Sequence, residues 1–69
     1  MREYKFNVGD KVYAVGSDFD AVFVGSVTRR GYVDGNINAY AVSNPKYKND
    51  VFLEDGLISA EVARSMVSE

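Results

Sequence analysis

The sequence predicts an all-β fold, a small antiparallel barrel of four to five strands followed by a short C-terminal helix. Three observations support this prediction. Short apolar runs, alternating or continuous, recur along the chain, and Gly, Asp and Asn residues separate them. The spacing of apolar residues changes from two to about four only near residue 59. The 69 residues suit one domain, which we expect to span residues 6–69.

The first predicted strand covers residues 11–15 and lies between two loops that contain glycine. Because side chains alternate along a strand, Val12 and Ala14 share one face and Tyr13 lies on the other. A strand that is covered on one side only has this pattern. We therefore expect Val12 and Ala14 in the core and Tyr13 at the surface.

The second and longest predicted strand covers residues 21–30 and contains Gly25. Glycine within a strand often marks a bulge or a sharp bend where another backbone comes close. A small barrel needs such a bent strand in order to close. Alternation through this segment predicts an inward row of Phe23, Gly25 and Val27.

A hairpin is predicted at Asp34-Gly35, because both central residues of a type I′ turn need positive φ. The third predicted strand covers residues 37–43, with Tyr40 and Val42 on one face. Pro45 follows this strand and ends it, since proline lacks the donor that a central strand requires.

The last two elements are a short apolar strand at residues 51–53 and a helix at about residues 59–67. Ser59 is a good candidate for the helix N-cap. Val62 and Met66 recur at helical spacing, so they form an apolar stripe. We expect this stripe to cover one open end of the barrel.

Enzymatic activity is not expected, because the chain contains neither His nor Cys. The usual general base and the best nucleophile are therefore missing. The usual zinc and haem ligands are missing too, and no cofactor or metal is predicted. The carboxylate pairs Asp18/Asp20 and Glu54/Asp55 are interpreted as solvated turn residues, because the other oxygen ligands of a calcium loop are not present.

Three segments together suggest a family. The segment Val8-Gly9-Asp10-Lys11-Val12-Tyr13-Ala14, the later Val24-Gly25-Ser26-Val27 and the strand Asn38-Ala39-Tyr40-Ala41-Val42 resemble the SH3-like barrel superfamily, with the Tudor and KOW branches closest in pattern. The resemblance covers about residues 6 to 55. It implies a binding module, and the Tudor branch adds an aromatic cage whose possible members here are Tyr13, Phe19 and Tyr40.

Protein binding is the first functional hypothesis. A lone barrel without an attached enzyme is typical of an accessory or inhibitory factor that docks on a larger protein, such as those that viruses and mobile elements encode. The aromatic residues proposed for the contact are Tyr13, Phe19, Tyr32 and Tyr47. The chain is expected to be a monomer or a weak homodimer, and the tail helix is a candidate for self-association.

Nucleic acid binding is the alternative hypothesis. Basic residues interleaved with aromatic residues are typical of single-strand binding, and the candidates are Arg29, Arg30, Lys46 and Lys48, with Tyr32 and Tyr47 between them. The net charge of −2 favours a protein partner instead. No apolar stretch approaches 18 residues and no signal peptide is recognised, so we expect no membrane span and a cytoplasmic location.

Overall fold

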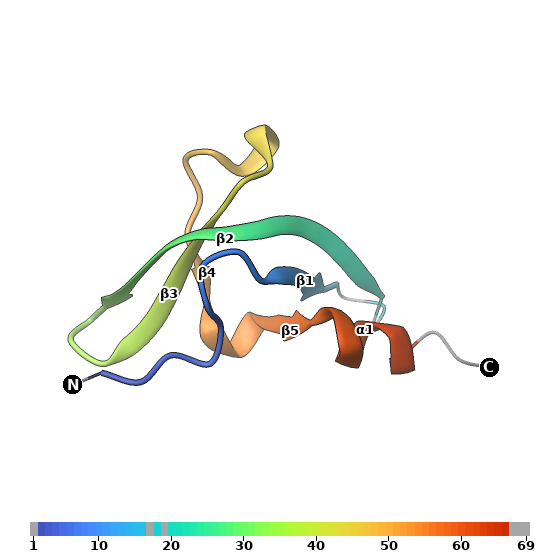
Figure 1. Ribbon diagram of the computed structural model, residues 1–69, viewed down its shortest axis with the longest axis horizontal. Coiled ribbons are helices and arrows are strands. Elements are labelled where there is room, and N and C mark those ends of the chain that lie inside the picture. The colour runs from blue at the N-terminus through green and yellow to red at the C-terminus, as the bar shows by residue number, and fades with distance from the viewer. Residues whose placement is uncertain (1, 17, 19, 67–69) are drawn as a thin grey trace.

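The computed structural model in Figure 1 describes residues 2–16, 18 and 20–66. Over these residues the chain is mainly β, with one antiparallel five-stranded sheet in the order β4-β3-β2-β1-β5. The elements in chain order are β1 (Lys11–Val15), β2 (Ala21–Val33), β3 (Ile37–Val42), the 3₁₀ turn η1 (Pro45–Tyr47), β4 (Phe52–Leu53), the 3₁₀ turn η2 (Glu54–Gly56), β5 (Leu57–Ser59) and α1 (Ala60–Met66). The antiparallel strands and the C-terminal helix confirm the coarse prediction.

The strand β2 is shared by both halves of the sheet. Residues 21–26 pair with β1, and residues 27–33 pair with β3. Figure 1 shows β2 as one long curved ribbon, with β3 crossing one half of it and β1 beside the other half. The edge strands β4 and β5 do not pair with each other within the described ranges. The sheet is therefore open, where the sequence predicted closure into a barrel.

The predicted bend lies at Gly25. Its φ is +123°, which disfavours every residue with a side chain, and a Cβ there would lie 2.9 Å from the backbone nitrogen of Asn44. The register also shifts at this point, because Gly25 pairs with Val12 and Phe23 pairs with Tyr13, which leaves Val24 as an extra residue. Gly25 is thus both a bulge and a close approach of two backbones.

The bulge corrects the predicted inward row of β2. Gly25 and Val27 are buried as expected, but Phe23 is 46% exposed and Val24 is 1% exposed. An extra residue reverses the alternation of side chains on one side of a bulge. Val24 therefore enters the core in place of Phe23, whose ring turns to the outer face.

The hairpin between β2 and β3 is confirmed at the predicted turn. Asp34 has a φ of +52° and Gly35 a φ of +75°, so both central residues are left-handed, as a type I′ turn requires. The backbone N–H of Asn36 donates to the carbonyl oxygen of Val33 at 3.2 Å and closes the turn.

The core lies on the inner side of the bent sheet and draws on nearly every element. It contains the buried side chains Phe6, Val12, Val24, Val27, Tyr40, Val42 and Leu57. Four half-buried residues pack against it, namely Tyr4, Ala14, Tyr47 and Phe52. Burial of Val12, Tyr40 and Val42 confirms the inner faces predicted for β1 and β3.

The helix α1 begins where it was predicted, because the hydroxyl oxygen of Ser59 accepts a hydrogen bond from the backbone N–H of Val62 at 3.2 Å. The expected apolar cover was wrong, since Val62 and Met66 are 48% and 39% exposed and Ala63 is the buried residue of the helix. No helix in the described part of the chain is long and apolar enough to cross a membrane.

Candidate binding surfaces

The outer face of β1 and β2 carries an aromatic pair, of which Phe23 is exposed and Tyr13 is half-buried. Tyr13 and Phe23 are cross-strand partners, and their rings meet edge to face with centroids 5.2 Å apart. On its other side Tyr13 pairs with Ile58 of β5. These three residues form a row across three strands, which we call the Tyr13–Phe23 surface.

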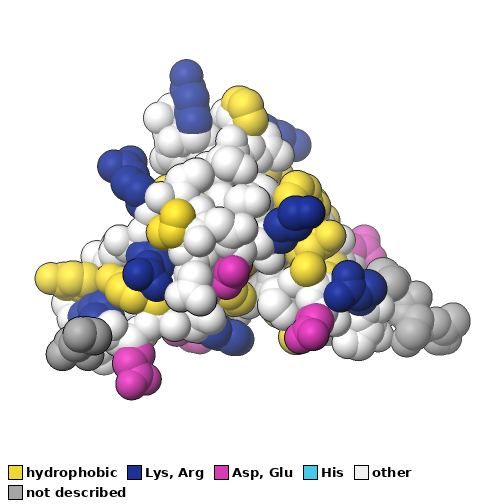
Figure 2. Space-filling view, viewed as in Figure 1, with side chains coloured by type: hydrophobic (Ala, Val, Ile, Leu, Met, Phe, Trp, Pro, Cys, Tyr) yellow, Lys and Arg dark blue, Asp and Glu magenta, His cyan; other side chains and the backbone are white. Residues whose placement is uncertain are grey.

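This surface remains open to solvent. Phe23 is 46% exposed, and Val15, two residues after Tyr13 on the same face, is 41% exposed. Figure 2 shows hydrophobic side chains gathered beside Lys and Arg side chains over the part of the sheet that holds β1 and β2. Contiguous exposed apolar side chains with a polar rim are typical of interaction sites.

Sequence reasoning assigned Tyr13 to the surface but missed Phe23 and Ile58. The available signal was Gly25, because a bulge at that residue predicts that the alternation before it is reversed. Phe19, the second aromatic residue proposed for a protein contact, lies outside the described residues.

Tyr32 is 58% exposed on β2, yet one of its ring faces is covered. The guanidinium of Arg2 lies over the ring, 4.0 Å from its centroid, and donates a hydrogen bond to Oδ1 of Asn38 at 2.7 Å. The amide Nδ2 of Asn38 in turn donates to the carbonyl oxygen of Glu3 at 2.8 Å. Tyr32 therefore anchors the beginning of the chain and offers only part of its ring to a partner.

Tyr47 on η1 contributes mainly to packing. It is half-buried against the core and meets Phe52 edge to face, with ring centroids 5.4 Å apart. The ammonium of Lys46 lies 5.6 Å from its ring centroid. Tyr47 thus connects η1 to β4, whereas Pro45 and Lys46 of this turn and the following Lys48 are exposed.

The aromatic cage implied by the Tudor resemblance lacks one proposed wall. Tyr40 is 1% exposed and packs against Phe6 and Tyr4, with ring centroids 5.3 and 6.1 Å away. Its hydroxyl group donates to Oε2 of Glu54. Burial and this hydrogen bond raise the pKa of Tyr40. Its ring belongs to the core and cannot receive a ligand.

Glu54 is the carboxylate with the most hydrogen bonds in the described part of the chain. Besides the Tyr40 hydroxyl, its Oε2 accepts the backbone N–H of Lys5 at 2.9 Å and Nδ2 of Asn38 at 3.0 Å. The Tyr40 and Lys5 hydrogen bonds lower the pKa of Glu54, because they stabilise the charged form. A carboxylate held in this way is a weak base, so its role is structural. The prediction that Glu54 is only a solvated turn residue was wrong, because its partners Lys5, Asn38 and Tyr40 come from distant segments.

The four predicted nucleic-acid contacts do not share one environment. Nη1 of Arg30 donates to the carbonyl oxygen of Phe6 and to Oδ1 of Asn7, both at 3.3 Å, and its guanidinium lies 4.6 Å from the ring centroid of Tyr4. Arg30 is therefore occupied within the molecule. Arg29 is exposed on the opposite face of β2, and Lys46 and Lys48 extend from η1.

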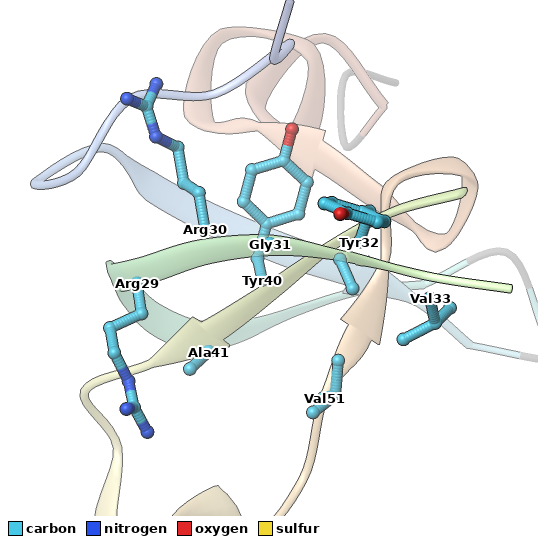
Figure 3. Close-up of a pocket in the computed structure, with 9 residues that line it drawn as sticks. Arg29, Arg30, Gly31, Tyr32, Val33, Tyr40, Ala41 and Val51 are labelled. Atoms are coloured by element: carbon cyan, nitrogen blue, oxygen red, sulfur yellow. The ribbon is translucent and has the colours of Figure 1, made fainter. Parts of the chain in front are cut away.

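A shallow groove of about 290 Å³ lies on the outer face of β2 and β3. Figure 3 shows that Arg29, Ala41 and Val51 lie on one side of these strands, while Arg30, Tyr32 and Tyr40 point to the other. The lining residues are Arg29, Arg30, Gly31, Tyr32, Val33, Ala39, Tyr40, Ala41 and Val51. Carboxylates are missing from this lining.

The chain was compared with known proteins, and no family model, curated protein or solved structure matches it.

Proposed function

We propose that this protein is a non-enzymatic binding module that docks on a larger protein as an accessory or inhibitory factor. The observation that carries the proposal is the exposed Phe23, held edge to face against Tyr13 on the outer face of the sheet. Aromatic side chains contribute much of the energy of protein interfaces. A ring that is half exposed in the free protein gains further burial when a partner covers it.

The architecture supports a module of the SH3-like class, in an open form. The sheet is bent at Gly25, its edge strands are short, and a 3₁₀ turn joins β4 to β5. The absence of His and Cys from the sequence supports binding without catalysis, and so does the hydrogen-bonded state of Glu54.

A protein partner is favoured over nucleic acid by the state of the basic residues. Arg30 binds within the molecule, and Tyr47 packs on the core. Phosphate recognition needs several free cations along one path, and base stacking needs open aromatic faces. The Tyr13–Phe23 surface offers apolar area instead, which suits side chains of a protein.

Site-specific cross-linking tests the proposal. The photoreactive amino acid p-benzoylphenylalanine replaces Phe23 in one variant and Lys48 in another, and both proteins are irradiated in nuclease-treated lysate of the source cells. We expect a protein adduct from position 23 and none from position 48. Equal labelling from both positions, or labelling from neither, would contradict the proposed surface.

A pair of matched substitutions provides a second test of the proposed surface. Phe23→Ser removes the exposed ring, whereas Val8→Ser changes an apolar residue that is 58% exposed on the N-terminal segment. Recovery of the cross-linked partner by affinity capture should fall about tenfold or more for Phe23→Ser, as for a central interface residue, and stay unchanged for Val8→Ser. Capture of nucleic acid that decreases steeply with salt would favour the alternative function.

A further inference from the structure

The groove on the outer face of β2 and β3 differs from the Tyr13–Phe23 surface in both place and chemistry. Its wall residues Val33 and Val51 are 38% and 59% exposed, and the small residues Gly31 and Ala41 also line it. Arg29 contributes a positive charge to the same lining. Arg30 also belongs to the lining, but its guanidinium lies on the other side of β2, so the cation that the groove presents is Arg29.

Arg29 has no hydrogen bond or ion pair with any of the residues that the structure describes. The neighbouring Arg30 shows the contrast, because its guanidinium binds Phe6 and Asn7 on the opposite face of β2. A guanidinium presents a planar fork of donors that matches a carboxylate in two parallel hydrogen bonds. Arg29 thus supplies the charge to which an acidic partner is complementary.

Nucleic acid fits this groove poorly. The rings of Tyr32 and Tyr40 point away from it, so no aromatic face is available for stacking a base (Figure 3). One free guanidinium is also too little for a backbone that carries a phosphate at every nucleotide. A peptide segment needs only one carboxylate and one aliphatic side chain at this site.

We propose that the groove between Arg29 and Val51 binds a partner segment in which an Asp or Glu stands beside a small aliphatic residue. The carboxylate pairs with the Arg29 guanidinium, and the aliphatic side chain lies over Gly31 and Ala41 and contacts Val51. This site is separate from the proposed Tyr13–Phe23 surface, and each can be tested without the other.

Titration of the ¹⁵N-labelled protein with three short peptides tests the proposal. The peptides are acetyl-Gly-Ser-Val-Asp-Gly-amide, the same peptide with Asn in place of Asp, and the same peptide with Gly in place of Val. We expect the amide signals of Gly31, Ala39 and Ala41 to shift with the first peptide. Its affinity should exceed that of each control by about fivefold, as for one solvent-exposed ion pair or one small apolar contact.

Two variants locate the contact. Arg29→Gln should abolish the preference for Asp over Asn, whereas Lys48→Gln makes the same change in net charge away from the groove and should preserve it. Gly31→Val fills the groove, and a Cβ at this position meets nothing within 4 Å, so the fold should be retained. Loss of all three titrations in Gly31→Val, with an otherwise native spectrum, is the expected result.

The proposal is overturned by equal affinity for the Asp and Asn peptides, by unchanged titrations in Arg29→Gln, or by no shifts at these amides. A parallel titration with a thymidine dodecamer covers the other ligand class. Tighter binding of the dodecamer than of the Asp peptide at the same amides would also overturn it. Phe23→Ser is expected to bind the Asp peptide as the wild type does. A negative result for the Tyr13–Phe23 surface therefore leaves the groove proposal unaffected, and the reverse also holds.

Discussion

The hydroxyl group of Tyr40 donates a hydrogen bond to Oε2 of Glu54 and thereby joins β3 to η2. The same oxygen accepts the backbone N–H of Lys5 at 2.9 Å, which adds the beginning of the chain to the contact. Three segments far apart in sequence thus meet at one carboxylate oxygen. In a domain with so small a core, this junction is a major polar contribution to the tertiary structure.

Removal of the Tyr40 hydroxyl should destabilise the protein. Tyr40→Phe keeps the ring in the core but takes one donor from Glu54, and we expect a loss of about 1–3 kcal/mol in the free energy of unfolding. Urea denaturation measures the change. Tyr4→Phe is the matched control, because Tyr4 contacts the same ring without a hydrogen bond from its hydroxyl among the described residues, and its effect should stay below about 0.5 kcal/mol. Equal losses in the two variants would refute the role of this junction.

The same pair predicts how stability depends on pH. The pKa of Glu54 is lowered from 4.5 by the Tyr40 and Lys5 hydrogen bonds. Its contribution to the free energy of unfolding is therefore present above pH 4.5 and is lost as the pH falls through the folded-state pKa. The pKa of Tyr40 is raised from 10.0 by burial and by Glu54, so that contribution is lost as the pH rises through its folded-state pKa.

Urea denaturation between about pH 3 and pH 11 tests this dependence. Glu54→Gln should be less stable near neutral pH and should show a flatter decrease toward acid. If the stability of Glu54→Gln decreases toward acid as steeply as that of the wild type, other carboxylates determine the pH dependence in this range.

Gly25 should tolerate no side chain. In Gly25→Ala the φ of +123° is strained and the new Cβ meets the backbone nitrogen of Asn44 at 2.9 Å, so we expect a loss of more than about 2 kcal/mol. Gly31→Ala on the same strand has open space around its Cβ and should change stability by less than about 1 kcal/mol in either direction. Thermal unfolding of both variants provides the comparison, and similar melting temperatures would contradict it.

The bulge predicts an unusual order of effects at two neighbouring positions. Val24→Ala should cost about 2–3 kcal/mol because Val24 is 1% exposed. Phe23→Ala removes a larger side chain but should cost only about 1 kcal/mol, since its ring is 46% exposed and contacts mainly Tyr13. Chemical denaturation ranks the two variants, and a larger loss for Phe23→Ala would place its ring in the core after all.

Much of the fold could be predicted because it depends on local chemistry. Positive φ at Asp34 and Gly35 follows from the turn type, and the cap at Ser59 follows from a hydroxyl at the start of a helix. The bend at Gly25 likewise follows from a glycine within an apolar strand. Each of these predictions needed only a few neighbouring residues.

The remaining features depend on pairing between distant segments. Alternation alone assigned Phe23 to the core, because it does not report how many residues of β2 stand opposite Val12. Leu57 and Phe6 enter the core from segments without a strand pattern of their own. The groove beside Arg29 likewise arises from the β2–β3 register, which places Ala41 opposite Arg29 and Ala39 opposite Gly31. Such features require the tertiary structure.

The position of β2 in both halves of the sheet has a consequence for the order in which the protein opens. If the middle of β2 detaches, β1 keeps only the three-residue β5 and β3 keeps only the two-residue β4 as a hydrogen-bonded neighbour. Detachment of these central residues therefore unfolds both halves of the sheet together, whereas the two-residue β4 can separate alone. The backbone N–H of Val27 donates to the carbonyl oxygen of Asp10 at 2.8 Å. In deuterated solvent, this amide should exchange only through global unfolding, and the amides of β4 should exchange well before it.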